Sequence, residues 1–219
     1  MRLTSPVGRL LVACGAAAAL VAGGTPLAAA STPRPARTPA ASFAHPRPYA
    51  HEAPYAHPRP YARLHAVAAL SAERLATADL VAAAKYGTGS PIDDPAREQQ
   101  VLDTVARLAR EAGGDPEATV RIFRDQIEAN KVVQRALHRR WDADPSTAPT
   151  ERPDLGRVRE VINRINGDLV RAIAASAPAR GAPHCSGTLT AAVVHVRHEQ
   201  RLDALHAPAL VRAVRSVCG

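Results

Sequence analysis

Residues 74–98, RLATADLVAAAKYGTGSPIDDPARE, contain the end of one predicted helix, a break and the start of the next helix. Arg74 and Lys85 are eleven residues apart, so both side chains return to nearly the same helix face, about 16 Å apart along the axis. Two long cationic side chains that reach toward each other across this gap leave room for a small anion. Arg97 adds a cation from the next helix. Because buried cations are costly without partners, the three together predict a small ligand with several negative charges.

The chain from residue 63 onward has the composition of an all-α domain. Ala, Leu, Arg and Glu dominate, and the alternating pattern that is typical of strands is absent. Asp94-Pro95 and Asp115-Pro116 each join a helix N-cap to a proline at the first helical position, and Asp154 is a third N-cap. Roughly 157 residues are enough for one well-buried domain. We predict a single helical bundle of about six helices, at about residues 63–86, 94–112, 116–142, 154–177, 185–199 and 202–217.

Polar side chains interrupt the apolar stripes of the predicted helices. Asn130 and Gln134 fall on the core-facing stripe of the third helix, and Arg159 interrupts the stripe of the fourth. Each residue alone fits a snorkelling cation or a hydrogen bond in the core. Together they favour a polar pocket inside the bundle. Asp94 and Glu98 either neutralise part of its positive charge or accept a hydrogen bond from a ligand hydroxyl.

The N-terminal part of the chain differs in composition from the rest. Residues 1–30 have the order of a secretory signal: a basic start, an apolar run too short for a membrane span, and a cleavage site near Ala30. An alternative is a lipoprotein with a lipidated Cys14. Residues 31–62 are rich in Pro, His and Arg and carry a hexapeptide repeat. They predict a disordered, polyproline-like linker, which is either a solvated tail, a weak anchor to an anionic cell envelope or a metal binder.

The cysteine pattern agrees with export. If Cys14 leaves with the signal, Cys185 and Cys218 are left as an even pair. In an exported chain such a pair predicts one disulfide rather than two buried thiols. We therefore expect a domain at residues 63–219 with a C-terminal disulfide, in a secreted, periplasmic or cell-envelope protein.

Charge and motifs exclude several classes of function. The net charge is +8, but most of it belongs to the signal and the linker, and the domain has few aromatic side chains that could stack on bases. The sequence therefore does not indicate nucleic-acid binding or stable membrane insertion. It shows no catalytic triad, zinc-ligand spacing or Gly-rich phosphate loop. His195 and His198 are three residues apart without clear further ligands, and we interpret them as surface positions, so we predict no metal and no cofactor.

The spacing of these site residues resembles that of a known family. The spacing Arg-x10-Lys-x8-Asp-x2-Arg-Glu, formed by the residues from Arg74 to Glu98, is similar to that of the all-helical chorismate mutases when Gln134 is added. The similarity is to their exported class, which has a signal peptide and a C-terminal disulfide, and it covers essentially all of residues 63–219. It implies an isomerase that converts chorismate to prephenate by a Claisen rearrangement without metal or cofactor, and it implies a homodimer.

The resemblance also implies a role for each site residue. Arg74, Arg97 and Arg159 correspond to the arginines that bind the carboxylates. Lys85 corresponds to the lysine that contacts a carboxylate and the breaking ether oxygen, and Gln134 to the second group at that oxygen. The other positions implied to lie near the substrate are Asp94, Glu98 and Asn130.

Two positions depart from the family pattern. Asn130 replaces a small hydroxyl residue, and exported members of the mycobacterial type carry Glu where this chain has Gln134. Two alternative functions stay open on this fold. One is an isochorismate pyruvate lyase, which shares the cationic pocket, and the other is a secreted binding protein or effector without turnover.

Overall fold

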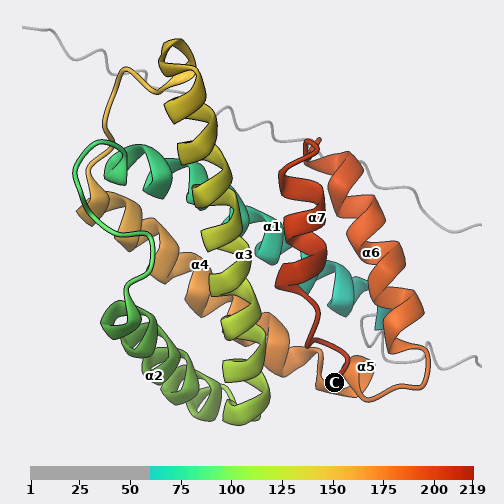
Figure 1. Ribbon diagram of the computed structural model, residues 1–219. Coiled ribbons are helices and arrows are strands. Elements are labelled where there is room, and N and C mark those ends of the chain that lie inside the picture. Colours follow the sequence, from blue (N-terminus) through green and yellow to red (C-terminus); the bar gives the residue numbers. More distant parts are fainter. Residues whose placement is uncertain (1–59) are drawn as a thin grey trace, which may run out of the picture. The chain divides into compact units, whose positions relative to one another are not determined.

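The computed structural model describes residues 60–219. The predicted signal, its cleavage site and most of the predicted linker lie outside these residues. Within them every regular element is helical (Figure 1), which confirms the all-α prediction. The elements are α1 (Pro60–Lys85), α2 (Pro95–Glu111), α3 (Pro116–Ala143), the 3-10 turn η1 (Pro145–Thr147), α4 (Leu155–Ala175), α5 (Ala177–Arg180), α6 (Cys185–Glu199) and α7 (His206–Ala213).

Helix α1 is the centre of the bundle. It packs against α3, α4, α6 and α7, while α2 packs against α3 and α4. Many of its buried positions are alanines, which let neighbouring helix axes approach closely. None of the helices within residues 60–219 combines the length and the apolar character needed to cross a membrane.

Helix starts follow the predicted caps. The Asp94 carboxylate accepts a hydrogen bond from the backbone N–H of Arg97 at 3.0 Å, which satisfies one of the donors that a helix start leaves unpaired. Asp115 and Asp154 cap α3 and α4 in the same way. At the other end of α2, Gly113 takes a left-handed φ of 68° and ends the helix.

Three predicted boundaries differ from the structure. Helix α1 begins at Pro60 rather than at residue 63, because proline is well suited to the first helical position. The fourth predicted helix is divided at Ser176, so that the short α5 follows α4. Helix α7 covers His206–Ala213 rather than residues 202–217.

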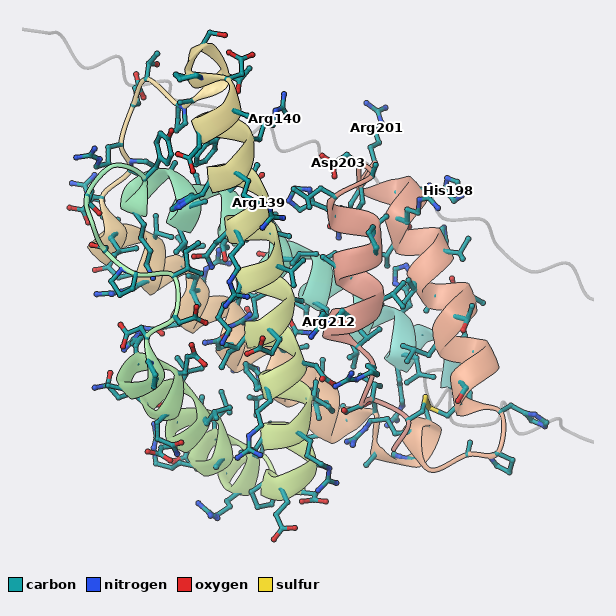
Figure 2. All side chains as sticks on the ribbon, viewed as in Figure 1. Arg139, Arg140, His198, Arg201, Asp203 and Arg212 are labelled. Atoms are coloured by element: carbon teal, nitrogen blue, oxygen red, sulfur yellow. A yellow bond between two sulfur atoms is a disulfide. The ribbon has the colours of Figure 1, made fainter. Side chains whose placement is uncertain are left out.

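The shorter α7 has a local cause. Arg201 turns the chain with a φ of 51°, and the carboxylate of Asp203 accepts hydrogen bonds from the backbone N–H groups of Leu205 and His206. Figure 2 shows Arg201 and Asp203 in this turn, before α7. The helix can therefore begin only after Asp203. Beyond Ala213 the chain continues in turns toward the disulfide.

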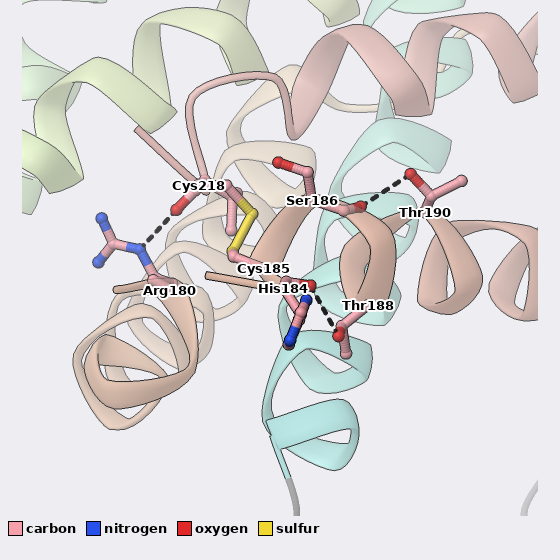
Figure 3. The surroundings of a disulfide bond; sticks show 8 residues. Arg180, His184, Cys185, Ser186, Thr188, Thr190 and Cys218 are labelled. Atoms are coloured by element: carbon pink, nitrogen blue, oxygen red, sulfur yellow. Dashed lines mark hydrogen bonds between the residues drawn. A yellow bond between two sulfur atoms is a disulfide. The ribbon is translucent and has the colours of Figure 1, made fainter. Parts of the chain in front are cut away.

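The predicted disulfide between Cys185 and Cys218 is present, with a Cα–Cα distance of 5.7 Å (Figure 3). It joins the first residue of α6 to the end of the chain. Close to it, the Arg180 side chain donates a hydrogen bond from Nε to the carbonyl oxygen of Val217 at 2.8 Å. The C-terminal segment is thus tied down both by a covalent bond and by a hydrogen bond.

Candidate active site

A cavity of about 120 Å³ lies among α1, α2, α3 and α4, and the segment between α1 and α2 contributes Ile92 and Asp94 to its lining. All eight residues that the sequence analysis assigned to a site line it, which brings together positions up to 85 residues apart in the chain. The remaining lining residues are mostly apolar. The full lining consists of Arg74, Val81, Lys85, Ile92, Asp94, Arg97, Glu98, Val101, Ile127, Asn130, Lys131, Gln134, Leu155, Arg159 and Ile162.

Arg74 is a buried cation held by neutral groups. Its side chain is 5% exposed. Nε donates to Asn166 Oδ1 at 2.8 Å, Nη1 donates to the Gln126 carbonyl oxygen at 3.2 Å, and the guanidinium lies 5.7 Å from the centre of the Phe123 ring. Burial lowers the pKa of Arg74 to about 10, so it stays charged at neutral pH. These partners fix the orientation of Arg74 but leave its charge without a compensating carboxylate among the hydrogen-bond partners found in residues 60–219.

Lys85 lies at the last position of α1 and faces the same cavity. Its Nζ donates to the carbonyl oxygen of Pro91 at 2.8 Å and, less closely, to that of Ile92 at 3.4 Å. Burial lowers the pKa of Lys85 below its ordinary value, and the charge of Arg159 lowers it further, whereas Asp94 opposes the shift. The ammonium group is thus positioned by neutral carbonyl oxygens, as Arg74 is.

The two acidic residues of the cavity are engaged by the protein itself. Asp94 caps α2 through the Arg97 N–H. Glu98 accepts a hydrogen bond from the Asp94 N–H at 3.3 Å and binds Lys131 Nζ through both carboxylate oxygens, at 3.2 and 3.1 Å. These contacts place both carboxylates at the start of α2, where they hold the helix and Lys131 in position.

Lys131 is a lining residue that the sequence analysis missed. It is 8% exposed and forms ion pairs with Asp93, Glu98 and Glu128. A signal for it was available, because residue 131 lies four positions after Ile127 and three before Gln134 and therefore on the stripe that carries both. Lysine is so common on exposed faces that this position did not stand out.

The amides on α3 behave differently from each other. Asn130 donates from Nδ2 to the carbonyl oxygen of Gln126, one turn earlier, at 2.9 Å. Gln134 is also buried, but its Oε1 has no hydrogen-bond partner within residues 60–219. Buried side-chain polar atoms are nearly always paired. Gln126 Oε1 is the other unpaired buried side-chain oxygen in these residues, but only Gln134 lines the cavity, where a ligand could reach its amide.

The remaining cations complete a positive cavity. Arg97 is half-buried and donates from Nη1 to Gln100 Oε1 at 3.2 Å, whereas Arg159, on α4, is exposed although it lines the cavity. The lining contains five Arg or Lys side chains against two carboxylates, a net charge of three. Such a cavity suits a small ligand that carries two or more negative charges and some apolar surface.

Comparisons with known proteins identify relatives of this chain. The profile of the family chorismate mutase type II matches residues 65–135. Secreted chorismate mutase of Mycolicibacterium smegmatis is 36% identical over 140 residues, which are 64% of this chain and 77% of that protein. The secreted chorismate mutase of Mycobacterium tuberculosis is 33% identical over 64% of this chain and 70% of that protein.

A solved structure extends the likeness to the fold. The crystal structure of chorismate mutase from Burkholderia phymatum is 36% identical and superposes with a TM-score of 0.69, over 73% of this chain and 98% of the other. The matched sequence includes Arg74, Lys85, Asp94, Arg97 and Glu98, which supply much of the cavity lining. On its sequence and on its fold, the chain belongs to the type II chorismate mutase family.

Proposed function

We propose that this protein is a chorismate mutase that converts chorismate to prephenate in the cavity among α1–α4. The observation that carries the proposal is the bonding of two of the five cavity cations. Arg74 and Lys85 hydrogen-bond to neutral oxygens. A buried charge that lacks an ionic partner strongly favours an anionic ligand. Chorismate is a dianion of the size class that such a cavity admits.

Substrate binding follows from the geometry of guanidinium groups. Arg74, Arg97 and Arg159 come from three different helices and can each present a fork of two N–H donors to a carboxylate. Arg74 is held in position before the substrate arrives, so little side-chain entropy is lost when it binds. Holding both carboxylates at once folds the enolpyruvyl arm over the ring, which is the conformation that reacts.

Catalysis in this proposal is electrostatic. As the ether C–O bond breaks and the new C–C bond forms, negative charge grows on the ether oxygen. Lys85 Nζ and the Gln134 amide nitrogen donate to that oxygen, and donors that are already oriented stabilise a transition state by several kcal/mol. Electrons and atoms rearrange within one molecule, so the reaction requires no nucleophile and no proton transfer. Asp94, Glu98 and Asn130 complete the wall near the substrate.

The proposal also covers the subunits, the domain limits and the export of the protein. All eight assigned residues come from one chain, so each subunit of the predicted homodimer would hold its own complete site. The catalytic domain begins at about residue 60, where α1 starts, rather than at the predicted residue 63; residues 1–30 are the signal, and the residues between the signal and α1 are the linker. Export of the protein is supported by the two relatives that are named as secreted.

The direct test is product identification with the purified mature protein. We expect chorismate to disappear and an equal amount of prephenate to form, while isochorismate is left unchanged. Release of pyruvate from isochorismate would instead indicate a lyase. Saturable binding of chorismate without product would indicate a binding protein on the same fold.

A further inference from the structure

Two histidines and a glutamate converge far from the cavity along α1. His65 lies near the start of α1, and His195 and Glu199 lie one turn apart near the end of α6, a spacing that places both on one helix face. None of the three lines the cavity. His65 Nε2 is 2.9 Å from Glu199 Oε2, and His195 Nε2 is 3.4 Å from Glu199 Oε1. The Glu199 carboxylate thus lies between the Nε2 atoms of the two histidine rings.

From this arrangement we infer that His65, His195 and Glu199 form a binding site for a divalent late transition metal such as Zn²⁺. One ligand atom from each residue lies within 4.8 Å of the others. In tetrahedral zinc sites with ligands at 2.0–2.1 Å, neighbouring ligand atoms are about 3.3 Å apart, so the three atoms need only small rotamer adjustments. Two imidazoles and a carboxylate are a common zinc ligand set. All three side chains are partly exposed, which leaves the fourth position to water.

A neighbouring side chain orients one of the ligands. The Tyr61 hydroxyl is hydrogen-bonded to His195 Nδ1 at 2.7 Å, and this contact directs Nε2 of the same ring toward Glu199. The Tyr61 ring also lies beside the His65 ring, with centroids 5.8 Å apart. Metal-binding histidines usually have their second ring nitrogen hydrogen-bonded in this way, because it fixes the tautomer and the ring orientation. A pair of simple His–Glu ion pairs does not require such a partner.

The position of the site suggests its role. The disulfide holds the start of α6 to the end of the chain, whereas the metal would hold the end of α6 to the start of α1. Helix α6 would then be cross-linked at both ends. Because the cluster is separate from the cavity, the metal would stabilise the folded protein without entering the reaction.

The test uses the mature chain without an affinity tag, and with His45, His51 and His57 replaced by Ala, because these tail histidines could bind metal themselves. We expect calorimetric titration with Zn²⁺ to give one site per chain and a higher Tm at saturating metal. Co²⁺ should give the visible absorption of a tetrahedral site. His65→Ala and Glu199→Gln should each weaken binding more than about 100-fold and abolish the absorption, and Tyr61→Phe should weaken it about tenfold.

The matched control is His198→Ala. His198 is exposed on the same helix as His195 and is not part of the cluster (Figure 2), so its removal should leave affinity and Tm shift unchanged. Equal binding by the parent protein, His65→Ala and Glu199→Gln would overturn the proposal. So would the absence of any metal-dependent change in Tm and absorption, which would identify the cluster as two ion pairs only. Both Glu199→Gln and Tyr61→Phe conserve size, so the test does not depend on His65→Ala remaining folded.

Discussion

Polar side chains are bonded differently in the cavity among α1–α4 and in the C-terminal region α5–α7. In the C-terminal region they are matched by the protein. Arg180 donates to the Val217 carbonyl, and the buried carboxylate of Asp125, on α3, accepts from Arg215 and from the Ser216 N–H. In the cavity Arg74 and Lys85 hydrogen-bond to neutral oxygens, whereas Lys131 is paired with carboxylates. Within the described part of the chain, Gln134 Oε1 has no partner in the cavity, and Gln126 Oε1 has none outside it. The contrast indicates that one region is arranged for a ligand and the other for stability.

This division predicts that Arg159→Ala has the largest effect on catalysis. Its side chain is exposed and lines the cavity, so its loss should leave the free energy of unfolding nearly unchanged. We expect the variant to lose about 2–4 kcal/mol of transition-state stabilisation, so that kcat/KM falls roughly 30- to 1000-fold. Arg157→Ala, an exposed residue two positions earlier that does not line the cavity, is the matched control. Similar kinetics in both variants would remove Arg159 from the site.

Removing the disulfide should lower stability and leave catalysis unchanged, the reverse of the result expected for Arg159→Ala. In a Cys185→Ala/Cys218→Ala variant, we expect the free energy of unfolding in urea to fall by about 3 kcal/mol, because the unfolded chain is no longer restrained. At a temperature where the variant is still folded, kcat/KM should equal that of the wild-type protein. A large loss of turnover in the fully folded double variant would show that the C-terminal region shapes the cavity.

Gln134→Glu tests the cavity more finely. A carboxyl group donates a hydrogen bond only when it is protonated, whereas an amide donates at every pH. We expect kcat/KM of the variant to fall about tenfold for each pH unit above the pKa of the introduced carboxyl. The wild-type rate should stay flat from about pH 5 to 8 and decline only on the alkaline side, where Lys85, with its lowered pKa, loses its proton. Circular dichroism at each pH checks that both proteins are folded. If the pH profiles of kcat/KM have the same shape for the wild type and the variant, Gln134 does not contact the reacting oxygen.

The smallest of these effects concerns His206, which joins α7 to α1. Its Nε2 is 3.1 Å from Asp79 Oδ1 and its Nδ1 is 2.8 Å from Asp203 Oδ1. The hydrogen bond to Asp79 raises the pKa of His206 from 6.5 to about 9, and the one to Asp203 adds to the shift against the effect of burial. The folded state therefore binds this proton more tightly than the unfolded state does.

The stabilisation by His206 is therefore complete below pH 6.5 and is lost as the pH rises through about 9. We expect His206→Gln to cost about 1–2 kcal/mol of unfolding free energy at pH 6 and little at high pH. His184→Gln, at an exposed position, is the control for the exchange of a histidine for a glutamine. A constant difference between wild type and His206→Gln across this range would mean that packing, not charge, accounts for the effect.

The sequence predicted the cavity better than it predicted the C-terminal region, for physical reasons. Helix periodicity places residues three and four apart on one face, so Asn130 and Gln134 could be assigned to the interior from spacing alone. Likewise, Asp94 and Asp115 mark helix starts through bonds to their own next few residues. These are local effects, and they are visible in a single sequence.

One missed feature is local: α7 begins late because the Asp203 carboxylate accepts hydrogen bonds from the Leu205 and His206 N–H groups, after the turn at Arg201. The other missed features depend on contacts between distant segments. The ion pairs of Lys131 with Asp93 and Glu98 join α3 to the start of α2. The cluster of His65 with His195 and Glu199 joins positions 130 or more residues apart, so His195 resembled an isolated surface histidine. Spacing cannot reveal such partners.

The positive charge of the cavity has a consequence for turnover. Prephenate carries the same two carboxylates as chorismate, so a site that recognises its substrate by charge retains its product with comparable strength. Only Lys85 and Gln134 respond to what changes between them, the ether oxygen. In the proposed enzyme, accumulated prephenate therefore competes with chorismate for the cavity, so that product inhibition accompanies tight substrate binding.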